Sequence, residues 1–310
     1  NKIRKITFLN HYDKIINSIL PFLKEVDVYV IEHSLNFNVN RNSRTKFFTN
    51  CISLRSEKED ESVIGLGSIK LLYYLEKLNR WNVCTQEYKN FFEKEIIYIS
   101  TLSGYFWNYA KHYNYNLNFD LSKIEIFLES IDSLKILKDN NDLLKMRFLD
   151  NLRLLGVIKK LENLGYKISI IARNLSTENH DLLIKEKKFY QKNFKKIDFY
   201  ELNEESKYEF LFNNREKVFM TDYSYFGFEA LSANIKCIFF SKYLKKYFSN
   251  FFKNDSIISN EDMSNIKKKI SHLTHMKIDE IQKFKKNLKK HFFIPEAKLE
   301  TLENFKKNLK

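Results

Sequence analysis

The chain has 310 residues, a formal net charge of +14 and 44% hydrophobic residues. This apolar content excludes an intrinsically disordered chain, and at ~150 residues per domain the length predicts one large or two medium domains. The longest apolar runs have the length of a strand, far short of the ~18 consecutive apolar residues that indicate a membrane span.

The excess of positive charge favours anionic partners, namely nucleic acid, an anionic membrane surface or phosphorylated substrates. Lysines concentrate in residues 267–269, 283–290 and 306–310. These stretches predict C-terminal helices with a basic face. That face either meets solvent alone or contacts an anionic membrane surface.

The three cysteines, Cys51, Cys84 and Cys237, are odd in number and lack the spacing of a metal site. This usage is typical of a reducing compartment. Residues 1–5 have none of the features of a secretory signal. The sequence therefore predicts a cytoplasmic protein, peripheral on the inner face of the membrane if the lysine-rich helices bind there.

The first part of the chain opens as strand, helix and strand. Residues 6–9 and 26–31 are apolar strands, and residues 14–24 form the helix between them, capped by Asp13. This order is the signature of a parallel sheet. Further elements are predicted as strands at 47–54, 83–84 and 96–100 and a helix at 64–81. The aromatic-rich stretch 104–115 fits a core better than a binding site.

The second part alternates more regularly. A long helix over 143–164 ends at Gly165, because glycine is favoured just past a helix. Strands are predicted at 168–172, 197–200, 218–220 and 237–240, with helices at 180–193, 205–212 and 226–233 and two more near the C-terminus. We therefore predict an α/β fold with two Rossmann-like domains, residues 1–136 and 137–310.

The most informative stretch is residues 216–241, which read as strand, polar turn, short helix and strand. The turn contains Thr221, Asp222 and Ser224, and Asn234 can end the helix. Such a unit places a helix N-terminus at the carboxyl edge of a parallel sheet, where anions and phosphates bind.

Within this stretch, the run Glu229-Ala230-Leu231-Ser232-Ala233-Asn234 resembles the donor-site segment of GT-B glycosyltransferases. The Thr-Asp-Tyr-Ser opening at 221–224 is similar to the CDP-glycerol glycerophosphotransferase family and related capsule and lipopolysaccharide enzymes. The resemblance implies two Rossmann-like domains facing across a cleft. It also implies a nucleotide-activated donor, CMP- or CDP-linked in the most similar enzymes, with no separate cofactor.

The resemblance further implies roles for residues of this segment. Glu229 is expected to bond the ribose hydroxyls of the donor, while Thr221 and Ser224 hold its phosphate. Asp222 either contacts the donor or caps the following helix.

Other candidate residues follow from the rule that ligands of a doubly wound sheet lie past the carboxyl ends of its strands. Inverting glycosyl transfer needs a general base, and His11 and His33 follow the first two strands. Asp13 can orient His11. In the second domain Arg173 directly follows a strand and can bind phosphate bidentately. The alternatives are loop histidines without a catalytic task and a structural salt bridge for Arg173.

No metal site is predicted, because the chain has no Asp-x-Asp, His-Glu-x-x-His or paired-cysteine spacing. The predicted function is a metal-independent transferase of bacterial surface polysaccharide (capsule or lipopolysaccharide) assembly. It would move a sugar or a polyol phosphate to a glycan or lipid-linked acceptor. Two alternatives remain open: a basic α/β protein that binds nucleic acid, and a non-catalytic Rossmann-like component of a polysaccharide export complex.

Overall fold

The structure is a computed structural model that describes residues 5–8, 27–32, 45–49, 63–65, 68–87, 94–112, 121, 143–241 and 263–288, and the single positions 299, 303, 306 and 307. The chain forms two compact units. The smaller consists of Asn1–Glu87, Phe228–Asn234 and Ile278–Lys310, and the larger of Tyr88–Gly227 and Ile235–Lys277.

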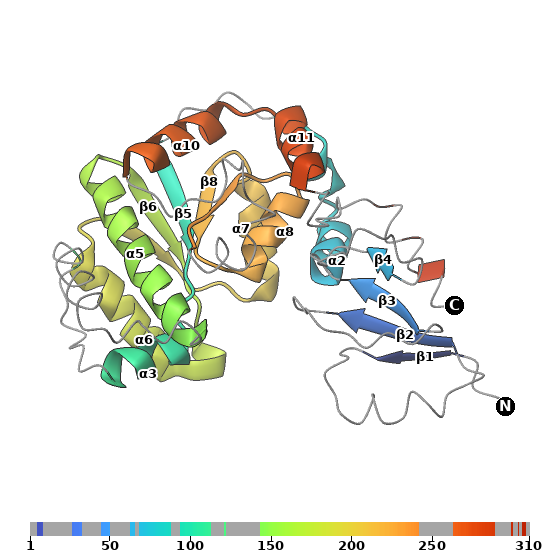
Figure 1. The fold of residues 1–310 in the computed structure, drawn as a ribbon, viewed down its shortest axis with the longest axis horizontal. Helices are drawn as coiled ribbons and strands as arrows, with labels where there is room; N and C mark the ends of the chain where they lie inside the picture. The colour runs from blue at the N-terminus through green and yellow to red at the C-terminus, as the bar shows by residue number, and fades with distance from the viewer. Residues whose placement is uncertain are drawn as a thin grey trace. The chain divides into compact units, whose positions relative to one another are not determined.

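The smaller unit contains a four-stranded parallel sheet with the strands in sequence order (Figure 1). Its strands are β1 (Lys5–Phe8), β2 (Asp27–Glu32), β3 (Thr45–Thr49) and β4 (Val63–Gly65). After β4 come helix α2 (Ile69–Lys77) and the 3₁₀ helix η2 (Trp81–Cys84), and α11 (Ile278–Leu288) belongs to the same unit.

Two predictions for this region are wrong. The predicted helix 64–81 is shorter, because Val63–Gly65 pairs with β3 and Ser68 caps the first turn of α2. The predicted strand 83–84 is part of η2. Both errors concern the short elements β4 and η2. Whether such a short segment forms a strand depends on whether a neighbouring strand pairs with it, and the local sequence does not reveal this.

The larger unit contains a five-stranded parallel sheet in the order β7-β6-β5-β8-β9. Its strands are β5 (Glu95–Ile99), β6 (Lys167–Ile171), β7 (Ile197–Tyr200), β8 (Val218–Thr221) and β9 (Cys237–Phe239). Every residue of β5, β8 and β9 is buried, as expected of parallel strands covered on both faces.

Helices cover this sheet on both sides. In Figure 1, α5 (Leu143–Asn163) and α6 (Ser176–Asn193) lie on one side and α7 (Glu204–Asn213) on the other. The remaining helices described are α3 (Gly104–His112), α8 (Tyr225–Ser232) and α10 (Met263–His275). The predicted α/β class is confirmed, and the larger unit has a strand order compatible with a Rossmann-like fold.

The division of the chain differs from the predicted boundary at residue 136. Strand β5 (Glu95–Ile99) lies in the centre of the larger sheet, hydrogen-bonded to β6 on one side and β8 on the other. The larger unit therefore begins at Tyr88. These pairings join residues more than 70 positions apart, as in Ile96 with Ile168, so no local pattern reveals them.

The predicted helix ends are confirmed at two positions. Gly165, after α5, has φ of +84°, and Asn234, after α8, has φ of +60°. Both lie in the left-handed region that glycine and asparagine tolerate best. The aromatic stretch also packs as predicted, since Phe106 and Trp107 are buried, although Tyr105 is 63% exposed.

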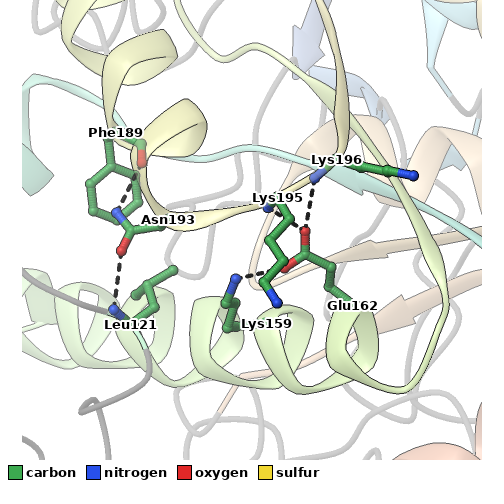
Figure 2. Close-up of polar contacts among 7 residues, drawn as sticks. All are labelled: Leu121, Lys159, Glu162, Phe189, Asn193, Lys195 and Lys196. Carbon is green, nitrogen blue, oxygen red and sulfur yellow. Dashed lines mark hydrogen bonds and ion pairs between the residues drawn. The ribbon is translucent and has the colours of Figure 1, made fainter.

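A polar network joins the C-terminal end of α5 to the loop that precedes β7. The Glu162 carboxylate accepts the backbone N–H groups of Lys195 and Lys196 at 2.6 and 3.1 Å, and it bonds Lys159 Nζ at 2.6 Å (Figure 2). Burial would raise the pKa of Glu162, but these bonds and the Lys159 charge outweigh it and hold that pKa below its usual value. This network therefore stabilises the amino edge of the sheet.

No helix in the described part of the chain is both long enough and apolar enough to cross a membrane. On α10, Ile266, Ile270 and Leu273 are buried in the core, whereas Lys267 and Lys268 are exposed. The apolar side of α10 thus packs against the core, and its basic side faces solvent.

Candidate functional site

The chain changes direction within the larger sheet between β5 and β8. From β5 it continues outward through β6 to β7, and it then returns to β8 and β9 on the other side of β5. In doubly wound sheets, ligands bind outside the carboxyl ends of the strands at this topological switch point. The residues that follow β5 and β8 are therefore the first to consider.

Three buried polar side chains meet at this point, and we call Thr101, Asn151 and Asp222 the switch-point cluster. Thr101 Oγ1 lies 2.5 Å from Asp222 Oδ1 and 2.6 Å from Asn151 Oδ1, and Asn151 Nδ2 donates to Asp222 Oδ2 at 3.0 Å. Thr101 follows β5, Asp222 follows β8, and Asn151 comes from the middle of α5. The cluster therefore ties the two strands at the switch point to the helix that covers them.

The environment of Asp222 has two opposing effects on its protonation. Burial raises the pKa of its carboxyl, while hydrogen bonds from Thr101 and from the backbone N–H of Tyr223, with the positive charge of Arg147, offset only part of the rise. Its side chain is 1% exposed. Asp222 therefore acts as an internal hydrogen-bond acceptor that orders the turn after β8.

Arg147 lies beside this cluster on the first turns of α5. Its guanidinium is 5.4 Å from the centre of the Tyr223 ring, and its backbone carbonyl accepts a hydrogen bond from Asn151 Nδ2 at 2.9 Å. The side chain is partly exposed. A positive charge thus lies at the turn that follows β8, in contact with the residue next to Asp222.

A second buried carboxylate orders the turn after β6. Glu186, on α6, accepts the backbone N–H groups of Arg173 and Asn174 at 3.0 and 3.1 Å. It also accepts the Asn174 side-chain amide at 2.7 Å and the Ser100 hydroxyl at 2.5 Å. Burial raises the pKa of Glu186, and these bonds oppose that rise without cancelling it.

The consequence for Arg173 is a fixed backbone with an exposed side chain. This placement at the carboxyl end of β6 agrees with the rule that selected Arg173 from the sequence. Its role as a phosphate ligand stays a prediction.

The predicted residues of the turn after β8 differ in their accessibility. Thr221 is fully buried, and its hydroxyl donates to the carbonyl of Ile99 at 3.2 Å. Ser224 is partly exposed, and its carbonyl accepts the N–H of Gly227 at 3.0 Å at the start of α8. Of these two hydroxyl residues, Ser224 is the one that can meet a ligand without a change in the strand.

Glu229 belongs to the smaller unit, whereas Thr221, Asp222 and Ser224 belong to the larger one. Glu229 is 2% exposed and accepts a hydrogen bond from the Ser68 hydroxyl. The same hydroxyl accepts the N–H of Leu71 at 3.1 Å as the cap of α2. Glu229 therefore has a structural partner, and its predicted contact with ribose stays a prediction.

The predicted base residues, His11, Asp13 and His33, lie outside the described residues. Among the residues that the structure does describe, no group of three or more His, Cys, Asp or Glu side chains is placed to hold a metal ion.

Sequence reasoning missed Thr101, Arg147, Asn151 and Glu186. Thr101 directly follows the predicted strand 96–100, so the carboxyl-edge rule would have found it had that strand been assigned to the second sheet. The other three are polar residues within helices. Nothing in their local sequence distinguishes them from solvent-exposed helix positions.

Comparisons with models of known protein families, with curated proteins and with solved structures find no match to this chain.

Proposed function

We propose that the chain is a transferase of the GT-B type, whose larger unit binds a nucleotide-activated donor at the switch point between β5 and β8. It transfers a sugar or a polyol phosphate to a glycan or lipid-linked acceptor in the assembly of a bacterial surface polysaccharide. CMP- and CDP-linked donors are the first candidates, because the 221–224 segment resembles enzymes that use cytidylate donors.

The observation that carries the proposal is the buried contact between Thr101 and Asp222. Asp222 belongs to the segment with the family resemblance, and its bond to Thr101 holds the turns after β5 and β8 together at the position where nucleotides bind in such sheets. Arg147 and Arg173 add positive charge near the ends of β8 and β6. An anionic ligand fits these surroundings.

The predicted location is part of the same proposal. The exposed Lys267 and Lys268 of α10 support contact with an anionic membrane surface, where a lipid-linked acceptor would be found. We place the protein in the cytoplasm, at the inner face of the membrane.

The direct test is thermal unfolding of the protein with UDP-, GDP-, CDP-, CMP- and ADP-linked compounds. A ligand at ~100 times its dissociation constant stabilises the folded state by roughly 2.7 kcal/mol, which is readily measured. We expect one base to protect more than the others, and a Ser224→Ala variant to lose part of that protection. If no nucleotide protects the protein and none of the donors is hydrolysed, the proposed function is wrong.

A further inference from the structure

We propose that Arg147, held over the ring of Tyr223, forms a binding site for the phosphate groups of an anionic ligand. This site deepens the proposed function and rests on it for the identity of the natural ligand, a nucleotide-activated donor. Neither residue was a candidate from the sequence, and the contact between them brings together positions 76 residues apart.

Arg147 brings several hydrogen-bond donors to this point. A guanidinium has five N–H donors and remains charged at all physiological pH values. Within the described part of the chain, the Arg147 side chain makes no hydrogen bond or ion pair. It lies over the Tyr223 ring and is attracted at longer range by Asp222. Among the described residues, no acceptor competes with a ligand for its N–H groups.

Tyr223 limits the orientations open to the Arg147 side chain. The centre of its ring lies 5.4 Å from the guanidinium carbon, within the range of cation–π attraction. The edges of a guanidinium supported in this way remain open, and they match the geometry of two phosphate oxygens. An arginine that is already oriented loses less side-chain entropy when it binds.

The negative charge nearest to Arg147 in the switch-point cluster has other hydrogen-bond partners. Asp222 could neutralise Arg147 by pairing with it, but its carboxylate oxygens instead accept bonds from Thr101 and Asn151. Asn151 also donates to the Arg147 carbonyl, so the same amide holds the helix turn that carries the arginine. The switch-point cluster therefore positions Arg147 without occupying its donors.

A matched control lies on the same helix. Arg153 is also partly exposed, but its guanidinium lies 3.6 Å from the carboxylate of Asp150. Replacing Arg147 or Arg153 by glutamine removes one positive charge from α5 in each case. Only Arg147 is proposed to meet the ligand.

The experiment is calorimetric titration of wild type, Arg147→Gln and Arg153→Gln with pyrophosphate, CDP and cytidine, at two salt concentrations. We expect Arg147→Gln to weaken pyrophosphate and CDP by about 10- to 100-fold, the equivalent of a lost charged hydrogen bond, and to leave cytidine unchanged. Arg153→Gln should bind all three ligands as the wild type does. Wild-type binding of the two anions should weaken at the higher salt concentration.

Several outcomes would overturn the site. One is that Arg147→Gln binds the anions as tightly as the wild type does. Another is that Arg147→Gln and Arg153→Gln lose the same amount of anion affinity, which would indicate a general effect of charge. A wild-type protein that binds no phosphate compound excludes the site as well. If Arg147→Gln does not fold, Arg147→Lys is tested in its place. Lysine keeps the positive charge but cannot donate two parallel hydrogen bonds as a guanidinium does, so this variant must bind pyrophosphate more weakly than the wild type.

The same data separate the two proposals. If pyrophosphate binds through Arg147 and no nucleotide in the panel binds, the anion site stands and the proposed function is wrong. If a nucleotide binds equally well with and without Arg147, the proposed function stands and this site is wrong.

Discussion

The hydroxyl of Thr101 donates a hydrogen bond to the carboxylate of Asp222 at 2.5 Å, although 121 positions separate the two residues in the sequence. Asp222 directly follows β8, Thr101 lies two residues after the end of β5, and both are at most 9% exposed. This bond joins the turns that follow β5 and β8, the two neighbouring strands between which the chain changes direction. It links the stability of the larger unit to the geometry of its candidate site.

Removal of this bond should destabilise the larger unit. Thr101→Val leaves the buried Asp222 carboxylate with one donor fewer, which costs about 1.5–3 kcal/mol. The chain has two tryptophans, of which Trp107 lies in the larger unit, so urea unfolding of a Trp81→Phe background can be followed by fluorescence of Trp107 alone.

Thr274→Val is the matched control for this change. The Thr274 hydroxyl donates to the Ile270 carbonyl of its own helix at 2.7 Å, and no buried carboxylate depends on it. Its loss should cost less than about 1 kcal/mol, because such a bond within a helix contributes little. Equal losses for the two valine variants would contradict the importance given to the bond between Thr101 and Asp222.

Gly227→Ala should also destabilise the larger unit. A Cβ atom at Gly227 would lie 2.9 Å from Thr221 Cγ2, closer than Cβ atoms come to other heavy atoms in folded proteins, and 3.0 Å from Phe239 Cζ, which is a tight contact. The backbone at Gly227 or the side chains of Thr221 and Phe239 would have to shift, at a cost of about 1–3 kcal/mol. Urea unfolding in the same Trp107 reporter background measures the loss.

Gly104→Ala provides the comparison for Gly227→Ala. A Cβ atom at Gly104 has its nearest neighbour at 3.6 Å, which is an ordinary van der Waals distance. Gly104 is also the first residue of α3, where alanine restricts the unfolded chain without strain. This variant should be neutral or slightly more stable, and a loss as large as that of Gly227→Ala would show that close packing is not the cause.

The pH dependence of stability should contain a contribution from Glu95. Burial alone would raise its pKa, but the bonds from Lys217 at 2.7 Å and Ser169 at 2.8 Å, with the charges of Lys217 and Lys167, lower it below the usual 4.5. A lowered pKa in the folded state means that this stabilisation is present above pH 4.5 and is lost as the pH falls through the folded value.

Glu95→Gln tests this contribution. The variant should lose about 1.5–3 kcal/mol at pH 7, the scale of a charged hydrogen bond, and the difference from wild type should shrink on acidification. Asp198→Asn is the control, because Asp198 is 44% exposed and its pair with Lys167 is a surface ion pair of small energy. A difference between wild type and Glu95→Gln that stays constant from pH 7 to pH 3 would exclude the assignment.

The two roles of Glu229 can be separated with Ser68. Ser68→Ala removes the cap of α2 and the hydrogen bond to Glu229, and it should destabilise the smaller unit by about 1–2 kcal/mol. Trp81, which lies in that unit, reports this loss in a Trp107→Phe background.

Glu229→Gln should weaken nucleotide binding by about 1–3 kcal/mol if Glu229 bonds the ribose. Unchanged nucleotide affinity in a folded Glu229→Gln protein would leave Glu229 with its contact to Ser68 and no role in the donor site.

Much of the larger unit could be predicted from the sequence. Residues 197–200 are a strand as predicted, and the strand, turn and helix at 218–232 agree with the prediction within a residue or two. These elements were predictable because short apolar runs, capping residues and asparagine or glycine at helix ends act locally. The positions of Arg173 and Asp222 just after predicted strands were also enough to select them, because ligands of such sheets bind past the carboxyl ends of the strands.

The sequence by itself determined the α/β class, most strand positions and the positive-φ helix ends at Gly165 and Asn234, because each depends on neighbours within a few residues. Tertiary structure decided that β5 belongs to the larger sheet and that Thr101 and Asn151 surround Asp222. It also decided that Arg147 lies over the ring of Tyr223 and that Glu229 accepts a hydrogen bond from Ser68. Each of these contacts joins residues that are far apart in the chain. They depend on which strands pair and on how the helices cross the sheet, and no pattern within one segment encodes that choice.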